Sequence, residues 1–372
     1  MVPREDTAAA HAGDPLAQLW RWFADTQCRG YSPLYEAIVR AVAADEELLG
    51  IVRAARPAAH LPLALLAAVH YQLLDGFEHP LADVYAGRSD ADPVPLFRDV
   101  CRRRRVEIDE LLATRHIQTN DCGRSAVIGP GLTWLAARLG DPLVLVDVGA
   151  SAGLNLLCDR YRLDYGDRGA TGPADSPVVV RCRVEGAAPI APWLPPIGAR
   201  VGVDRAPIDL TRPEDARWLL ACVWPDTGRL ERTAAAIELA RRDPPVVVEG
   251  DANEAVPGVL AGLPGDAVPI VITTWAFAYL SIEERAAFTV MLAEESRRRP
   301  LAWLSAEGAG TVEALGRALP ARADAEDADV LGAIVFDGGA PRAQVLGLVH
   351  SHGHWLDWRA PASDAFGAVI AR

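Results

Sequence analysis

The chain contains no lysine, because all 37 basic residues among its 372 are arginines. Enzymes that form a Schiff base with their substrate need a lysine amine, and a lysine general base needs the same group. Both kinds of chemistry are therefore excluded for this chain.

Cysteine is scarce, and its spacing has no metal-binding pattern. The six cysteines form no C-x-x-C pair, which is the usual spacing of a structural zinc site. No secretory signal pattern precedes them, so we expect reduced thiols and a cytoplasmic protein. The longest apolar run, residues 61–74, is interrupted by His70 and Gln72 and is too short to cross a bilayer, so it predicts a buried helix.

Acidic residues outnumber basic residues, with 50 against 37. The formal net charge is −13 at neutral pH. A field of this sign opposes nonspecific binding to nucleic acid or to anionic lipid. We therefore expect a small-molecule substrate, with neither nucleic acid nor a membrane as partner, while the oligomeric state is left open.

Two kinds of sequence pattern divide the chain into expected domains. Residues 14–140 carry helical signals, such as Ser32 followed by Pro33 at the start of an apolar repeat with helical spacing. After Pro142, short β-branched runs alternate with amphipathic segments. The sequence thus predicts a disordered tail over 1–13, a helical cap or lid domain over 14–140, an α/β domain over 142–358 with an insertion at 166–199, and a C-terminal tail over 359–372.

The alternating pattern after Pro142 predicts an α/β fold with a Rossmann-like, mostly parallel sheet. Its expected strands are LVLVDVG, RVGVD, PVVVEGD, PIVITTW and LAWLSAEG, and the segment 154–163 after the first strand is predicted to be helical. Two further strand-like runs flank Gly338-Gly339-Ala340-Pro341, which is typical of a hairpin. The sheet is therefore expected to finish with an antiparallel pair.

The segment GASAG, residues 149–153, has two interpretations. It matches G-x-S-x-G, the turn that presents a nucleophilic serine in hydrolases, and Asp251 and the histidines of 350–354 follow in the required order. A hydrolase needs strands before this turn to complete its oxyanion hole, whereas only helices are expected there. The alternative is a cofactor loop, with Asp147 two positions before its first glycine and a helix start after it.

Carboxylates at later strand ends favour the cofactor loop. Asp204 ends the second expected strand, where a carboxylate can accept both ribose hydroxyls. Asp251 and Ala252 follow the third strand, where they can contact an adenine. The carboxyl ends of parallel strands are where open α/β sheets bind ligands. NAD is the competing ligand, but its G-x-G-x-x-G fingerprint and the acid about twenty residues beyond it are not found here.

This order of motifs resembles that of class I S-adenosylmethionine-dependent methyltransferases. The resemblance covers residues 142–358, with DVGASAG as the glycine loop, GVD, GDA and ITTW at the next three strand ends, and the closing antiparallel pair. It implies S-adenosylmethionine as cofactor and methyl transfer to a small molecule as function. It also implies a cofactor site built from Asp147, Gly149, Ser151, Gly153, Asn155, Asp204, Asp251, Ala252 and Thr274.

The whole chain also resembles an uncharacterised family of bacterial proteins. The similar segments are YSPLYE, QTN..GR, VGASAGLNL, RWL...VWP and HG.WL.W. This resemblance supports the domain layout but implies no reaction. Since a fold does not determine function, a non-catalytic protein that binds S-adenosylmethionine or a related nucleoside, as a sensor or partner subunit, stays an alternative to the enzyme.

Candidates for catalysis each have a structural alternative. Trp275 and Tyr279, after the fourth strand, are either an aromatic wall around a sulfonium or ordinary packing residues. Glu307, after the fifth strand, is either a pocket carboxylate or a helix cap. His70 is either a general base or a hydrogen-bonded core residue, and the adjacent Tyr71 is a further catalytic candidate.

Two polar segments complete the set of candidates. In HIQTNDCGR, residues 116–124, Asn120 and Arg124 are expected to bind the cofactor's carboxylate or a substrate acid, with a capping turn satisfied by Asn120 or Asp121 as the alternative. In HSHGH, residues 350–354, the histidines alternate like metal ligands, but Gly353 interrupts the strand. A turn without a metal is therefore predicted there.

Overall fold

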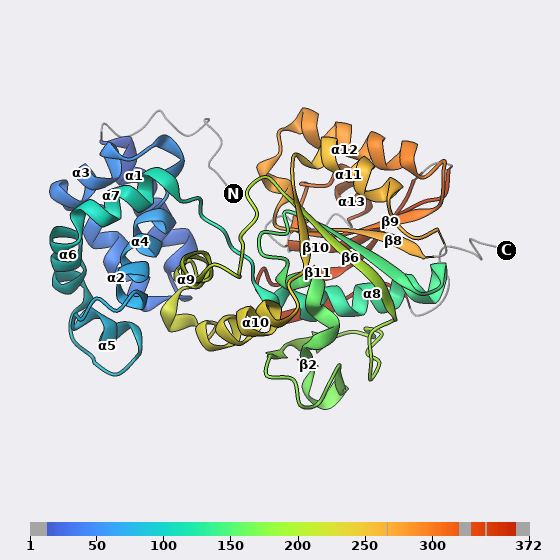
Figure 1. Cartoon of the computed structure of the whole chain (residues 1–372), viewed down its shortest axis with the longest axis horizontal. Coiled ribbons are helices and arrows are strands. Elements are labelled where there is room, and N and C mark those ends of the chain that lie inside the picture. The colour runs from blue at the N-terminus through green and yellow to red at the C-terminus, as the bar shows by residue number, and fades with distance from the viewer. Residues whose placement is uncertain (1–12, 266, 320–328, 339–340, 362–372) are drawn as a thin grey trace. The chain divides into compact units, whose positions relative to one another are not determined.

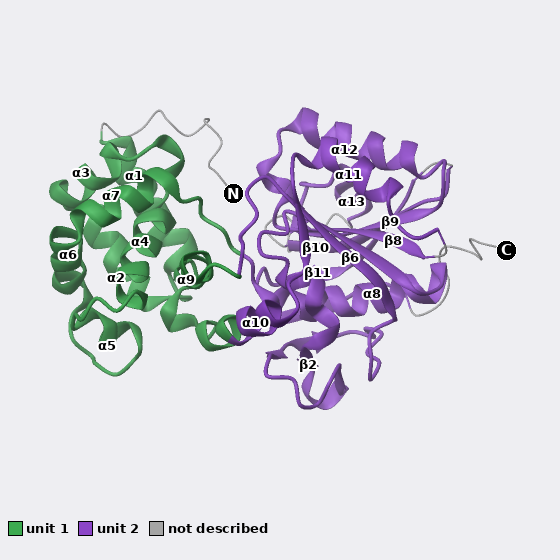
Figure 2. Ribbon diagram, in the orientation of Figure 1, with its two compact units in different colours: residues 1–119, 211–234 green, residues 120–210, 235–372 purple. Residues whose placement is uncertain are grey.

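The structure, a computed structural model, describes residues 13–265, 267–319, 329–338 and 341–361. The chain divides into two compact units, one formed by residues 1–119 and 211–234 and the other by 120–210 and 235–372 (Figure 2). Of the two predicted tails, residues 1–12 and 362–372 lie outside the described residues. None of the described helices combines the length and the apolar character needed to cross a membrane.

The first unit is helical throughout its described residues (Figure 1). Ser32 begins one helix as expected, because its hydroxyl accepts a hydrogen bond from the Tyr35 amide at 3.1 Å. The apolar repeat after Pro33 is interrupted at Asp45, whose side chain caps a second helix. The helices are α1 Pro15–Phe23, α2 Pro33–Val42, α3 Glu46–Ala54, α4 Pro62–Leu74, α5 Leu81–Tyr85, α6 Pro93–Arg103, α7 Arg105–Thr114 and α9 Pro213–Ala221.

Helix α9 joins this unit although its sequence lies among the strands. Its Trp218 indole donates a hydrogen bond to the carbonyl of His116 at 2.7 Å, and it packs on α4. By contrast, α8 (Ser125–Leu139) belongs to the second unit, where it contacts β9 and β10. The division of the chain therefore differs from the expected boundary at residue 140. Helix α10 (Leu230–Arg242) spans the point where the chain passes from one unit to the other.

The second unit has an α/β fold with a large, mostly parallel sheet. Among the described residues, the strand order is β5-β12-β11-β10-β9-β8-β1-β6-β7. The five strands from β7 to β9 are parallel, and β10 and β11 form the expected antiparallel pair. The strands are β1 Leu143–Val148, β5 Arg183–Glu185, β6 Ile197–Asp204, β7 Val246–Glu249, β8 Val268–Thr274, β9 Leu301–Gly308, β10 Asp329–Phe336, β11 Arg342–Val349 and β12 Trp355–Trp358.

Helices cover both faces of this sheet (Figure 1). Helix α11 (Ala252–Ala261) contacts β1 and β6, and α12 (Ile282–Glu295) packs on α11, while α8 lies on the other face. The short helix α13 (Glu313–Ala318) contacts β10 and β11. All six residues of β1 are buried, which explains why five of them are apolar and do not alternate with polar residues, Asp147 being the exception.

The expected helix over 154–163 is wrong in its second half. A 3₁₀ helix covers Leu154–Arg160, with a non-helical backbone at Leu157, and strand β2 (Arg162–Asp164) follows. The hydroxyl of Tyr161 donates to the carbonyl of Leu154 at 2.7 Å, which folds the segment back on itself. The local apolar pattern could not distinguish this packed turn from a regular helix.

The insertion at 166–199 contains three complete short strands, which belong to two different sheets. Strand β4 (Val179–Arg181) pairs with β2 in a small sheet with β3 (Ala170–Thr171), whereas β5 lies beside β12 at the edge of the main sheet. The insertion thus does not separate β1 from β6, which are direct neighbours.

The strand order creates a reversal between β1 and β8. The chain runs outward from β1 to β6 and β7, then returns to β8 on the other side of β1 and continues to β9. In open α/β sheets, ligands bind beyond the carboxyl ends of the strands at such a reversal. The expected cofactor residues of the glycine loop follow β1, and Asp204, Asp251, Ala252 and Thr274 lie at or just after the ends of β6, β7 and β8.

Candidate functional site

The turn after β1 is held in left-handed backbone conformations. Gly149, Ser151 and Gly153 have φ values of +78°, +54° and +75°. This conformation costs a non-glycine residue such as Ser151 roughly 1–2 kcal/mol. Asp204, at the end of β6, compensates: its Oδ2 accepts from the Ser151 amide at 2.7 Å and its Oδ1 accepts from the Ala206 amide at 2.8 Å. The expected neighbourhood of Asp204 and the glycine loop is therefore present, with Asp204 holding the turn itself.

The two glycines of the turn allow other parts of the protein to approach closely. A Cβ added to Gly149 would lie 2.3 Å from the Cβ of Ala276, and one added to Gly153 would lie 2.6 Å from the Cγ of Pro245. A cavity of about 210 Å³ remains beside the turn, lined by Ala152, Pro207, Ile208, Asp209, Leu210, Pro244, Pro245 and Val247. This volume is below the roughly 300–1,000 Å³ of ordinary ligand pockets, so it would hold only part of a ligand.

Substituting alanine for Gly149 should therefore be strongly destabilising. The new methyl group would combine left-handed backbone strain with an overlap against Ala276, and we expect a loss of roughly 3 kcal/mol in the free energy of unfolding. Gly166→Ala is the matched control, because its φ is +62° and no atom lies within 4 Å of the added Cβ. It should cost only roughly 1 kcal/mol. Urea titrations of both variants measure the difference, and equal losses would contradict this account of Gly149.

Asp251 and Ala252 lie at the start of α11. The Asp251 side chain caps this helix by accepting from the Asn253 amide at 2.9 Å. It also pairs with Arg205 at 2.5 Å, and Arg205 in turn pairs with Glu284 at 3.0 Å. Asp251 is thus engaged by a neighbouring side chain, an ion pair that the sequence did not indicate.

Asp147 is the most unusual carboxyl of the site. It lies within β1, is 1% exposed, and neither of its oxygens has a hydrogen-bond partner. Burial raises its pKa to about 7, and the charge of Asp204 adds to this effect while that of Arg124 opposes it. A buried polar group without a partner is costly, so such groups point to a ligand, an ion or a water that completes them.

Arg124 is the nearby cation, and it is also buried. It is 7% exposed, its Nη1 donates to the carbonyl of Thr274 at 2.9 Å, and its Nε donates to that of Ser351 at 3.4 Å. Its guanidinium lies over the Trp275 ring, 4.9 Å from the centroid. Within the described part of the chain it forms no ion pair, and burial lowers its pKa although the charges of Asp121, Glu307 and Asp147 act in the opposite direction.

Two buried asparagines contact the segments that follow β1 and end β8. Asn120 accepts a hydrogen bond from the Leu154 amide at 2.9 Å, which makes it a cap of the 3₁₀ helix after the turn. Asn155 donates to the hydroxyl of Thr274 at 3.3 Å. The Asn155 carbonyl and the Ser151 hydroxyl are buried, and neither has a partner. The structure thus brings the expected residues Asn120, Arg124, Ser151, Asn155 and Thr274 to one edge of the sheet.

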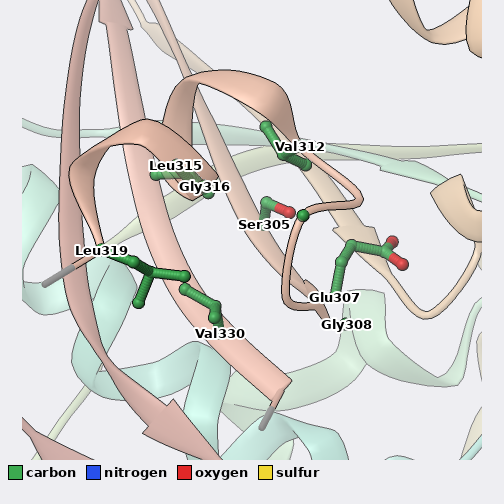
Figure 3. A pocket seen from close by; sticks show the side chains of 9 residues that line it. Ser305, Glu307, Gly308, Val312, Leu315, Gly316, Leu319 and Val330 are labelled. Carbon is green, nitrogen blue, oxygen red and sulfur yellow. The ribbon is translucent and has the colours of Figure 1, made fainter. Parts of the chain in front are cut away.

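Glu307 extends the site toward β9. It is 2% exposed, and its Oε1 accepts from the amides of Ala276 and Phe277 at 3.1 and 2.9 Å. Its Oε2 has no partner, and burial raises its pKa to about 7. A cavity of about 10 Å³, the size of one water, lies beside it, and Figure 3 shows the carboxylate directed away from Leu319 and Val330. Glu307 therefore holds the loop after β8 with one oxygen, while its other oxygen is buried without a hydrogen-bond partner.

The other catalytic candidates lie in different surroundings. Trp275 has a φ of +52°, a strained value for a bulky residue. Tyr279, four residues later, is 82% exposed.

His70 is buried in the helical unit, where its Nδ1 lies 3.1 Å from the Ala221 carbonyl, and burial lowers its pKa to about 4. Tyr71, in the same unit, accepts a hydrogen bond from Arg217 at 3.1 Å. His70 thus has the geometry of a core histidine.

The histidines of 350–354 form the turn between β11 and β12. His352 Nδ1 lies 2.8 Å from Asp121 Oδ2, and the rings of His350 and His354 stack with centroids 4.4 Å apart. Among the residues that the structure describes, no group of three or more histidine, cysteine, aspartate or glutamate side chains is arranged to hold a metal ion.

Comparison of the sequence with known protein families identifies the family of this chain. The family described as an uncharacterised protein conserved in bacteria, DUF2332, matches residues 17–358, which span both units. The chain belongs to the DUF2332 family. No curated protein and no solved structure matches it.

The two buried carboxyls should make the stability of the DUF2332 protein depend on pH. Asp147 and Glu307 have pKa values of about 7 when folded, above the ordinary values of 3.8 and 4.5. The folded state therefore binds more protons than the unfolded state between about pH 4 and 7, so these groups lower stability as pH rises through that range. We expect a lower urea midpoint at about pH 8 than at about pH 5.5. Asp147→Asn should reduce this difference, and an unchanged difference would contradict the assignment to Asp147.

Several residues of this DUF2332 site were not predicted in their observed roles. Arg205 had no predicted role, and the pairing of Asp121 with His352 was not expected. The pair of His352 and Asp121 joins positions 231 residues apart, so no local pattern could show it. For Asp121, the only local signal was its position before Gly123, which is typical of a cap.

Proposed function

We propose that this DUF2332 protein binds S-adenosylmethionine at the carboxyl ends of β1, β6 and β8 and transfers its methyl group to a small molecule. The observation that carries the proposal is the state of Asp147 and Arg124. Asp147 has no hydrogen-bond partner, and the buried Arg124 has no ion pair in the described part of the chain. A ligand with both an ammonium and a carboxylate would complete both groups.

The amino-acid end of S-adenosylmethionine has this pair of charges. Arg124 uses two of its five N–H donors on backbone carbonyls, so others are available for a carboxylate. Asp147 would accept from the ammonium, and the unpartnered oxygens of Ser151 and Asn155 offer further acceptors. Isolated buried charges are unfavourable, and a bound zwitterion would stabilise both.

The nucleoside end is assigned to Asp204. Each of its oxygens accepts one backbone hydrogen bond, and a carboxylate oxygen has a second acceptor position for a ribose hydroxyl. In chain order, the parallel strands β7-β6-β1-β8-β9 are 3-2-1-4-5, as in the first five strands of a Rossmann sheet. This order supports the Rossmann-like assignment. The contact of Asp251 and Ala252 with the adenine stays a prediction.

The reacting end is assigned to the ends of β8 and β9. When bound, the cofactor would supply an electrophilic methyl carbon on its sulfonium, which an acceptor nucleophile attacks in line while the C–S bond breaks and the thioether S-adenosylhomocysteine leaves. Trp275 would shield that position through its ring face, and Glu307 Oε2 would hold the proton lost by an acceptor that carries one. A covering role for the helical unit, like the cytoplasmic location, stays a prediction.

Two alternatives use the same residues. The contacts proposed for Asp147, Arg124 and Asp204 explain binding but not catalysis. A regulatory protein that binds the nucleoside without turnover would use them equally well. A serine hydrolase would need a base within hydrogen-bond reach of Ser151, whose hydroxyl has no partner among the described residues. Labelling of wild type but not of Ser151→Ala by a fluorophosphonate would support the hydrolase.

Calorimetry with S-adenosylmethionine and S-adenosylhomocysteine tests the proposal. We expect both to bind, and failure of both to bind would reject the enzyme and the sensor together. Release of S-adenosylhomocysteine on addition of a metabolite extract would then identify an enzyme. Binding without release would favour the regulatory protein.

A further inference from the structure

The turn formed by residues 350–354 is built against the segment that carries Arg124. Asp121 Oδ2 pairs with His352 Nδ1 at 2.8 Å, and the two side chains are 3% and 17% exposed. The His352 amide donates to His350 Nδ1 at 3.0 Å, so the turn has an internal hydrogen bond of its own. A buried aspartate is thus held by a histidine from the far end of the chain.

The same aspartate shapes the backbone before Arg124. Asp121 Oδ1 accepts from the Gly123 amide at 2.8 Å and caps the 3₁₀ turn Cys122–Arg124. The two segments also meet through their backbones, because a Cβ on Gly353 would lie 2.0 Å from the Gly123 carbonyl oxygen. Arg124 itself donates to the carbonyl of Ser351. Three separate contacts therefore connect the turn to the position of the guanidinium.

We propose that His352 is a positioning residue, which acts through Asp121 to hold Arg124 where it binds the carboxylate of the ligand's amino-acid end. This inference rests on the proposed function and deepens it, since it assigns a role to a motif that the methyltransferase resemblance does not use. Around metal sites, partners that orient a ligating group typically change affinity 10–100-fold when they are removed, and we expect the lower end of that range here. A long arginine side chain has many rotamers, so its placement depends on such support.

The test compares two thioether nucleosides by calorimetry. S-Adenosylhomocysteine has the amino-acid end, whereas 5′-methylthioadenosine lacks it. His352→Ala should lower the affinity for the first about tenfold and leave the second unchanged. His352→Asn, which keeps a donor near the place of Nδ1, should recover most of the loss. In an Arg124→Met background, His352→Ala should have no further effect.

The outcomes separate this inference from the proposed function. An equal loss for both nucleosides would show a merely structural role and overturn the inference, as would a loss that persists in the Arg124→Met background. If wild type binds neither nucleoside, the proposed function falls and the inference falls with it. Should His352→Ala fail to fold, Asp121→Asn is interpreted by the same criteria.

A matched control removes a similar pair elsewhere. His79 and Asp99 pair at 3.0 Å within the helical unit. His79→Ala should leave the ratio of the two affinities at the wild-type value. A change of that ratio as large as the one in His352→Ala would also overturn the inference.

Discussion

Asp147→Asn is expected to lower the affinity for S-adenosylhomocysteine about 100-fold while making the ligand-free protein more stable. Removing one partner of a buried charge pair costs about 2–5 kcal/mol of binding, and 100-fold corresponds to about 2.7 kcal/mol. In the free protein, the same change removes a buried carboxylate whose oxygens have no partners. The neutral amide avoids the cost of burying a charge. Calorimetry and urea unfolding at about pH 8 measure the two effects.

Glu307→Gln is the matched control for this prediction. Glu307 is also buried, has a pKa raised to about 7 and has one unpartnered oxygen, but it is assigned to the reacting end of the ligand. Its substitution should also raise stability at high pH, yet leave the affinity for S-adenosylhomocysteine unchanged. Wild-type affinity in Asp147→Asn, or a loss of stability in that variant, would contradict the role given to Asp147.

Asp204→Ala is expected to destabilise the protein by about 3 kcal/mol and also to weaken binding of S-adenosylhomocysteine. The substitution removes two hydrogen bonds to a charged group, each contributing about 1.5–3 kcal/mol, and frees the strained turn at Ser151. The affinity should fall because the turn loses its support and the ribose loses its acceptor. Urea unfolding and calorimetry are again the measurements.

Ser151→Gly provides the check on this second prediction. Glycine adopts positive φ without penalty, so this change in the Asp204→Ala background should recover about 1 kcal/mol of stability. It should not restore ligand affinity, because no carboxylate replaces Asp204. If Ser151→Gly gives no recovery, the strain at Ser151 is not what Asp204 compensates.

The parallel strands were predictable because each is a short, largely apolar run that alternates with helical segments. The antiparallel pair of β10 and β11 was predicted from two strand-like runs on either side of a hairpin signal. The segment 154–163 was not predictable, since a packed 3₁₀ turn and a helix place apolar residues similarly. The position of α9 was not predictable either, because an amphipathic pattern shows that one face of a helix is buried but not which element covers it.

The candidate site could be predicted as a set of strand ends but not as a network. Strand topology alone places Asp147, Asp204 and Glu307 at one edge of the sheet. Whether a side chain there is free depends on contacts between distant segments, as with Asp251 and Arg205, 46 residues apart. The unpartnered state of Asp147 is likewise a property of packing, and no residue pattern indicates it.

A crystal structure with S-adenosylhomocysteine tests the proposed site directly. We expect the ligand's carboxylate to lie within hydrogen-bond distance of Arg124 and its amino group within that distance of Asp147, with the ribose at Asp204. A ligand bound elsewhere, or bound at this edge with Asp147 and Arg124 both untouched, would contradict it.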